Sequence, residues 1–143
     1  MKKSLRVKRC RWLELQFFND GPDGFLTIAE EHVQIPFPIA RVFFINRLSN
    51  KNAIRGVHAH KTQEQAIFCI NGSFELEIYD GKNRQQITLD NPRRGIYVGP
   101  KVWNVMRAFS RDCVILVFSS GRYKESDYIR DFREFKRFLK KTN

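Results

Sequence analysis

Short apolar runs separated by turn-forming residues fill the sequence from residue 6 to residue 119, and this pattern constrains the fold more than any other feature. The runs are rich in Val, Ile, Phe and Tyr, the residues typical of β-strands. Segments such as Asn71-Gly72-Ser73 and Asp80-Gly81-Lys82-Asn83 supply residues that tolerate the backbone angles of hairpin turns. Many short strands without intervening helices predict an all-β sandwich or barrel. The predicted strands are Trp12–Phe18, Phe25–Ala29, Val42–Asn46, Gly56–Ala59, Ala66–Ile70, Phe74–Tyr79, Gln86–Leu89, Gly95–Val98, Val102–Arg107 and Cys113–Phe118.

The tail of the sequence has a different pattern. Residues 126–141 carry an apolar residue at every third position, with charged residues between them. This spacing predicts one amphipathic C-terminal helix, for which Ser126 or Asp127 would be the N-cap. The apolar positions are Ile129, Phe132, Phe135 and Phe138.

The length and composition favour one soluble domain. With 143 residues, 42% hydrophobic residues and 13 Phe, the chain can bury one core but not two, so we expect a single domain over residues 1–143. No run approaches the ~20 apolar residues of a membrane span. The basic N-terminus is not followed by the apolar stretch of a secretory signal. Cys10, Cys69 and Cys113 lack metal-site or redox spacing and predict free thiols, so we expect a cytoplasmic protein without a membrane partner.

The net charge of +11 is concentrated in the first dozen residues and between Arg122 and Lys141. Such a charge favours anionic partners, although a solvated basic surface gives the same composition. A nucleic-acid-binding β-barrel is the non-enzymatic alternative. That function would place aromatic residues among Lys and Arg on one exposed sheet, whereas the excess charge here lies at the two ends of the chain. We therefore expect no nucleic-acid partner.

The densest cluster of functional side chains runs from Arg55 to Gln65 and contains His58 and His60. Residues two apart on a strand project from the same face, so the two imidazoles should lie side by side. A metal site is one interpretation, because His58, His60 and Glu64 could supply three ligands for Zn, Fe or Mn. No His follows His60 to complete such a site, and we expect no bound metal or other cofactor.

Acid–base catalysis is the second interpretation of the histidine pair. Imidazole has an ordinary pKa near ~6.5, so modest environmental shifts make it either a base or an acid at neutral pH. Two imidazoles on one face could remove a proton from one carbon and return it to the next. Arg55 could hold a phosphate or stabilise enolate charge beside them.

The run from Arg55 to Lys61, Arg-Gly-Val-His-Ala-His-Lys, resembles the Arg-Gly-aromatic-His-Ala-His-Lys signature of the nucleotide-sugar 3,4-ketoisomerases. These enzymes are cupins that act on dTDP-4-keto-6-deoxyglucose. The likeness extends from about Phe25 to the C-terminus with order and spacing kept. Further matching segments are Ile35-Pro36-Phe37, Ile39 to Ile45, Cys69-x-Asn71-Gly72-Ser73, Ile87-Thr88-Leu89-Asp90-x-Pro92, Tyr97-Val98-Gly99-Pro100-x-Val102-Trp103, Phe109-Ser110-x-Asp112-Cys113-Val114 and Asp127-Tyr128-Ile129-Arg130.

The resemblance implies a cupin jelly-roll β-barrel with one C-terminal helix and a metal-free, cofactor-free isomerase. The C3 proton of a dTDP-linked 4-keto sugar would be removed, an enediolate would form, and a proton would return at C4. His58 and His60 would be the catalytic pair. The family also forms homodimers in which N-terminal strands are exchanged. Its product is a keto sugar for later transamination into cell-surface glycans.

Substrate-binding candidates come partly from positions near the histidine pair and partly from three departures from the family pattern. Asn104 stands where the family usually has His or Arg, Asp23 stands in an altered early segment, and Phe43 replaces a Tyr that often lines the pocket. These changes leave the C4 epimer of the product open, and a slow or inactive relative is one alternative. A 3,5-epimerase-like cupin is another. The expected substrate-binding residues are Arg41, Arg55, Gln65, Tyr97, Asn104 and Asp23.

Overall fold

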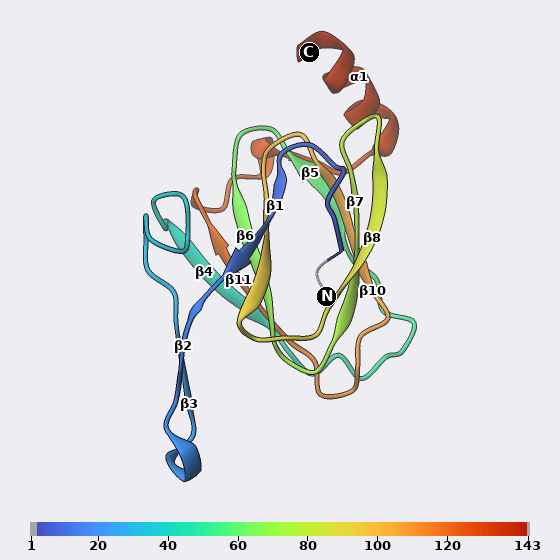
Figure 1. The fold of residues 1–143 in the computed structure, drawn as a ribbon. Helices are drawn as coiled ribbons and strands as arrows, with labels where there is room; N and C mark the ends of the chain where they lie inside the picture. Colours follow the sequence, from blue (N-terminus) through green and yellow to red (C-terminus); the bar gives the residue numbers. More distant parts are fainter. Residues whose placement is uncertain (1–2, 143) are drawn as a thin grey trace.

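The computed structural model describes residues 3–142, most of which lie in two facing five-stranded sheets (Figure 1). The first sheet has, in order, β1 (Cys10–Glu14), β9 (Arg94–Val98), β6 (Gln65–Asn71), β11 (Val114–Ser119) and β4 (Arg41–Ile45). The second has β12 (Tyr128–Ile129), β5 (Arg55–His60), β10 (Trp103–Arg107), β7 (Phe74–Tyr79) and β8 (Arg84–Leu89). Within each sheet neighbouring strands are antiparallel. The all-β prediction is confirmed, as two jelly-roll sheets whose ladders do not join into a closed barrel in the described chain.

The main core lies between the two sheets, because alternate residues of each strand point inward. In β7 the side chains of Phe74, Leu76 and Ile78 are fully buried while the residues between them are only half-buried. Ile67 and Ile115 approach from the opposite sheet into the same cluster. Stretches of alternating sequence therefore became strands because one face of each could be removed from water.

The C-terminal helix α1 (Phe132–Thr142) starts later than predicted, so the expectation of a helix over residues 126–141 was wrong at its N-terminal end. Residues 128–129 form β12, which pairs with β5, and this extended conformation cannot continue a helix. The helix is capped instead by Asp131, whose Oδ1 accepts a hydrogen bond from the Glu134 backbone amide at 2.9 Å. Phe135 and Leu139 pack α1 onto the outer surface of the second sheet.

The predicted strand Trp12–Phe18 is divided, and its second half belongs to a separate hairpin. This hairpin consists of β2 (Gln16–Asn19), the short 3-10 turn η1 (Gly21–Asp23) and β3 (Phe25–Ile28), and it projects away from both sheets (Figure 1). We call residues 16–28 the arm. Its apolar side chains Phe18, Phe25 and Leu26 are 44%, 69% and 50% exposed, so the arm lacks a core of its own.

The predicted single domain of residues 1–143 includes residues 1, 2 and 143, which lie outside the described part of the chain. Within residues 3–142 the only α-helix is α1, and it is too short and too polar to cross a bilayer.

Candidate active site

A β-bulge in β5 determines how His58 is presented. His58 pairs with Asn104 of β10, but the next residue of β10, Val105, pairs with Gly56. Val57 is therefore the extra residue, and its φ of 58° lies in the left-handed region that β-branched residues rarely adopt. Gly56 also has a positive φ, and a Cβ there would lie 2.8 Å from the Asn104 Oδ1 atom. This close approach requires glycine at position 56.

The bulge also changes which residues of β5 share a face. Arg55 pairs with Met106, a residue that points between the sheets. Simple alternation would have placed Arg55 on the opposite face from His58, because the two are three residues apart. The extra residue puts both on the inner face. The Arg55 side chain remains exposed at the edge of this face.

The two histidines lie next to each other, which confirms the predicted shared face. Their ring centroids are 5.0 Å apart. The ring of Tyr128, on the neighbouring strand β12, lies 5.0 Å from His58 and 4.5 Å from His60. Three aromatic rings therefore form one cluster at the end of β5.

Asp127 fixes the orientation of His60. Its Oδ2 atom lies 2.9 Å from His60 Nδ1, and its Oδ1 accepts hydrogen bonds from the Thr62 amide and hydroxyl at 2.9 and 2.6 Å. Burial alone would raise the pKa of Asp127, but the hydrogen bonds from Thr62 and His60 outweigh it and hold the pKa below its usual value. The carboxylate is therefore an acceptor, and His60 Nδ1 carries the hydrogen. His60 Nε2 is left as a buried atom without a partner in the described chain.

Both imidazoles are held in the neutral form at pH 7. Burial, followed by the neighbouring His60, lowers the pKa of His58 to about 4. Burial also lowers the pKa of His60, although the hydrogen bond and charge of Asp127 oppose this effect. His58 Nδ1 lies 3.0 Å from the Gly56 carbonyl oxygen, to which it donates. Each ring therefore offers Nε2 as a proton acceptor.

Arg41 reaches this cluster from the first sheet. Its Nη2 atom donates to Gln63 Oε1 at 3.2 Å and lies 3.5 Å from the Tyr128 hydroxyl. Ser119 Oγ donates to the same Gln63 oxygen at 3.0 Å, and the Arg41 guanidinium lies over the Phe43 ring at 5.3 Å. The Arg41 Nε is buried without a partner among residues 3–142. A cation with unused donor capacity thus stands beside the histidines.

Asn104 and Gln65 both lie on inner faces. Asn104 is 1% exposed and donates through Nδ2 to the His58 carbonyl oxygen at 3.2 Å. Its Oδ1 is a second buried acceptor without a partner in the described residues. Gln65 is buried at the start of β6, on the same strand face as Ile67 of the main core. Both expected residues therefore join the interior that the histidines face.

Two expected residues are not brought to this site within one chain. Tyr97 lies on the other face of the first sheet, where its ring centroid is 6.3 Å from that of Phe37. Burial, followed by the nearby Glu64 carboxylate, raises the pKa of Tyr97 to about 12. Asp23 lies in η1, at the tip of the arm, far from β5 (Figure 1).

The set of His58, His60 and Glu64 does not assemble as a metal site. Glu64 is next to Tyr97 on the other side of the sheet. Within residues 3–142, no three His, Cys, Asp or Glu side chains lie close enough together to hold an ion. The acid–base interpretation of the pair is the one that the geometry supports.

Sequence reasoning missed three residues of this cluster: Asp127, Tyr128 and Gln63. Asp127 and Tyr128 stand in a segment that matched the ketoisomerase pattern, but the helical spacing of the tail concealed their role. Gln63 was passed over because Glu64 and Gln65 flank it. Its Nε2 donates to the Arg122 carbonyl oxygen at 2.8 Å, which fixes the amide that holds Arg41.

Comparisons with known proteins identify the family of this chain. Residues 8–140 match the family model described as FdtA: WxcM-like, C-terminal. The chain is 47% identical over 120 residues to the TDP-4-oxo-6-deoxy-alpha-D-glucose-3,4-oxoisomerase of Aneurinibacillus thermoaerophilus, covering 84% of this chain and 86% of the relative.

Two solved structures are also similar. One is a histidine-to-asparagine mutant of the 3,4-ketoisomerase QdtA from Thermoanaerobacterium thermosaccharolyticum in complex with TDP-4-keto-6-deoxyglucose. It has a TM-score of 0.90 and 34% identity, and covers 94% of this chain and 96% of that one. The other is the WlaRB TDP-quinovose 3,4-ketoisomerase of Campylobacter jejuni, with a TM-score of 0.86 and 37% identity, covering 92% and 99%. With a family model spanning most of its length and a relative of this identity, the chain belongs to the FdtA (WxcM-like, C-terminal) family.

Proposed function

We propose that the protein is a sugar-nucleotide 3,4-ketoisomerase that converts dTDP-4-keto-6-deoxy-D-glucose into the 3-keto-6-deoxy sugar. The observation that carries this function is the cluster of two neutral imidazoles with Asp127 behind one of them. The similarity to a TDP-4-oxo-6-deoxyglucose 3,4-oxoisomerase supplies the substrate.

The reaction moves two protons, and the site has two imidazoles for them. One imidazole Nε2 takes the C3 proton, and the C–H electrons form a C3–C4 double bond while the C4 carbonyl oxygen becomes an enediolate oxygen. The imidazole proton exchanges with solvent, and a proton is then delivered to C4. The proton of the C3 hydroxyl passes to the C4 oxygen, so C3 becomes the carbonyl and C4 carries the hydroxyl. The atoms and charge balance without a metal or another cofactor.

The two environments suit two different tasks. Asp127 lies on Nδ1 of His60 and stabilises a transient imidazolium there, so we assign to His60 the ability to hold a proton during the reaction. His58 has only a backbone carbonyl on Nδ1, and with its pKa lowered to about 4 by burial it is neutral across the physiological range. Arg41 and the Asn104 amide are the groups available to stabilise the enediolate.

Substrate binding is proposed for Arg41, Arg55, Gln65 and Asn104, which occupy the inner faces near the pair. Arg41 has an unpartnered, buried Nε in the described chain, and a guanidinium can bind a diphosphate through two parallel hydrogen bonds. Tyr97 remains a candidate for this role only through the family pattern, because its ring points away from the histidines.

We further propose a homodimer in which the arm contacts a second copy of the chain. The exposed apolar residues of the arm support this assembly, as do Val42 and Phe44 on the edge strand β4, which are 54% and 65% exposed. A dimer would also offer Asp23 a place near the partner's site. The three cysteines are free thiols, in keeping with the reducing cytoplasm that we propose as the location.

The function is tested by incubating the protein with dTDP-4-keto-6-deoxyglucose in D2O and following the sugar carbons by NMR. We expect the carbonyl to move from C4 to C3 and deuterium to appear at C4. A 3,5-epimerase would instead exchange at C3 and C5 and leave the carbonyl at C4. Unchanged substrate without label would contradict both activities.

A further inference from the structure

A basic hollow lies at the end of the jelly roll where α1 stands, and none of the residues of the histidine cluster lines it. It has a volume of about 590 Å³ and is formed by the turn before β1, the β7–β8 turn and one face of α1. These three segments lie together at one end of the molecule in Figure 1. Five lining side chains are cations: Lys8, Arg9, Lys82, Lys136 and Lys140.

The hollow is held in shape by close packing between the turn and the helix. Gly81 has a φ of 99°, and a Cβ at that position would lie 2.5 Å from Leu139 Cδ1. Leu139 is buried against the outer face of the second sheet. Lys136 and Lys140 are four residues apart on the helix and therefore share the face that borders the turn.

The five cations of the hollow outnumber its one acidic residue, Asp80. No ion pair formed by residues 3–142 includes any of the five. The Arg9 guanidinium donates through Nη2 to the Lys101 carbonyl oxygen at 3.1 Å, while its Nε is buried without a partner in the described chain. Five positive charges gathered around one negative charge repel one another on balance, and this repulsion is relieved when an anion binds.

Asp80 also lines the hollow and sets one negative charge against the five cations. Its Oδ2 accepts a hydrogen bond from the Lys8 amide at 2.6 Å, and its Oδ1 accepts bonds from the amides of Lys82 and Asn83 at 2.8 and 2.7 Å. Those bonds hold the carboxylate against the backbone. They also tie the Lys8 and Lys82 backbones into one position, which keeps the two side chains on the same hollow.

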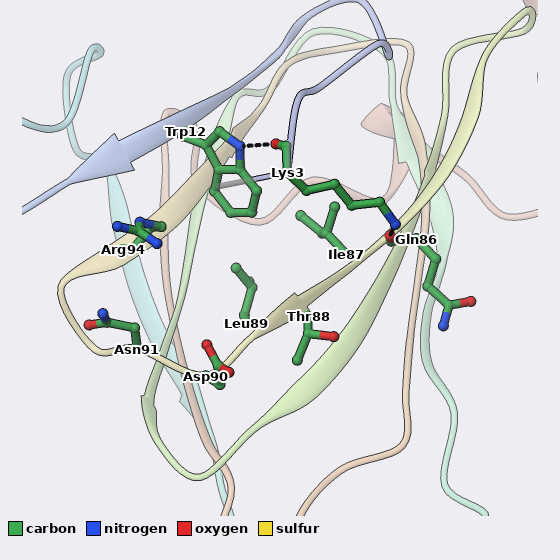
Figure 2. A pocket seen from close by; sticks show the side chains of 9 residues that line it. All are labelled: Lys3, Trp12, Gln86, Ile87, Thr88, Leu89, Asp90, Asn91 and Arg94. Atoms are coloured by element: carbon green, nitrogen blue, oxygen red, sulfur yellow. Dashed lines mark hydrogen bonds between the residues drawn. The ribbon is translucent and has the colours of Figure 1, made fainter. Parts of the chain in front are cut away.

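A second hollow provides a contrast. It has a volume of about 340 Å³ and lies on the seam between β1 and β8, beside Trp12 (Figure 2). Its cations are already engaged: Lys3 Nζ donates to the Gln86 carbonyl oxygen at 3.0 Å, and Arg94 pairs with Glu14 at 2.8 Å. The seam hollow therefore has two cations, one of them in an ion pair, whereas the basic hollow gathers five cations from three segments.

We propose that the basic hollow binds a small anion carrying two or more phosphate groups, at a site separate from the histidine cluster. Its volume falls within the roughly 300–1,000 Å³ typical of small-molecule sites. Arg84 lies over the Tyr79 ring beside it at 4.5 Å, and Phe132 and Phe135 pack against the same ring at 5.7 and 6.2 Å. The site therefore offers phosphate-binding charge rather than a stacking surface for a base. A bound anion bridges α1 to the β7–β8 turn and so stabilises the docked helix.

The test is a titration of the ¹⁵N-labelled protein with inorganic pyrophosphate, followed by amide chemical shifts. We expect saturable shifts at Lys8, Gly81, Lys82 and the α1 amides. The double variant Lys136→Gln/Lys140→Gln should raise the dissociation constant about tenfold, the effect of losing two partly screened charge contacts. Binding should also weaken as salt is added. The matched control Arg133→Gln/Lys141→Gln removes the same charge from the same helix outside this hollow and should change the constant less than about twofold.

Three results would overturn the proposal. One is the absence of saturable shifts around the hollow, with or without shifts at β5 and β12. Another is equal weakening in the two double variants, which would indicate general attraction to a basic protein. The third is binding of single-stranded DNA far tighter than pyrophosphate and sensitive to both double variants, which would identify an extended nucleic-acid surface.

Discussion

The two ends of the space between the sheets differ in chemistry. At the end near β12 the buried side chains include His60 and Asn104, and each has a buried polar atom without a partner in the described chain. At the other end, Phe74 stacks with Phe109 at 6.0 Å, and Leu89 is 1% exposed in the same apolar cluster. One jelly roll therefore contains a packed half and a half with unused hydrogen-bonding capacity.

This difference separates stability from function. A buried polar atom without a partner costs roughly 1–3 kcal/mol, so such groups lower stability where they occur. The packed half offsets that cost, because burial of large apolar side chains contributes about 1.5–3 kcal/mol each. Substitutions in the half with the histidines should therefore slow the reaction and leave the fold intact. Substitutions in the packed half should lower the free energy of unfolding and leave the reaction rate unchanged.

Removal of the imidazoles should have the largest effect on the reaction rate. His58→Asn and His60→Asn should each slow proton exchange by about 10²–10⁴-fold, the range for a positioned acid or base, and leave the fold intact. The measurement is the D2O NMR assay with circular dichroism alongside. His32→Asn is the matched control, because His32 is an exposed residue outside the site. Exchange near the wild-type rate in both site variants would remove them from catalysis.

A substitution in the packed half should lower stability without slowing the reaction. Phe74→Ala removes a fully buried ring and should lower the free energy of unfolding by about 3–5 kcal/mol, through lost burial and the cavity left behind. Urea unfolding measures this loss. The exchange rate per folded molecule should stay at the wild-type level. A large loss of rate in protein that is still folded would mean that the two halves are not independent.

Asp127→Asn tests the carboxylate that orients His60. The pKa of His60 should fall further, because the carboxylate that opposes the effect of burial is lost. The imidazolium formed during turnover is then less stable, and kcat should fall by about 10–100-fold with little change in KM. The acidic limb of the pH–rate profile should move to lower pH, since His60 remains neutral further into the acid range. An unchanged profile would limit Asp127 to a structural role.

The smallest expected effect concerns the residues that replace the usual family groups. Asn104→His, alone or with Asp23→Arg, adds basic groups and should raise turnover severalfold or change the C4 epimer, because a cation stabilises the enediolate more than an amide does. NMR of the product measures both. If the arm stays away from the site, Asn104→His alone should change the rate or the epimer. If the arm of a partner subunit completes the site, only the double variant should change them. No change in rate or epimer in either variant would exclude these positions from control of the sugar.

Local patterns predicted much of the fold, because each strand alternates between a buried and an exposed face. The tail was harder to predict. Ile129 continues the helical spacing of Phe132 and Phe135, yet it lies in β12, since pairing with β5 and the buried Asp127 decide that segment. Such long-range contacts leave no periodic trace in the sequence. The direction of Tyr97 was also hard to predict: its neighbours on the strand point inward, so within one chain Tyr97 points away from the histidines.

The sequence predicted the pair of histidines but not the hydrogen bond that Asp127 makes to one of them. Two histidines separated by one residue are visible in any strand, whereas Asp127 reaches His60 across 67 positions of sequence. The sequence also did not predict which face of β5 carries Arg55. Alternation places it opposite His58, and a valine gives no sign of a bulge, because β-branched residues disfavour positive φ.

The bulge at Val57 means that the geometry of the site depends on the number of residues in β5 as well as on their types. Val57 is 42% exposed, so the space around its side chain sets little limit on which residue stands there. Deletion of that single codon would restore regular alternation and turn Arg55 away from the inner face, while every recognisable letter of the motif survived. The presence of a residue at position 57 therefore matters to the arrangement of the site independently of which side chain that residue carries.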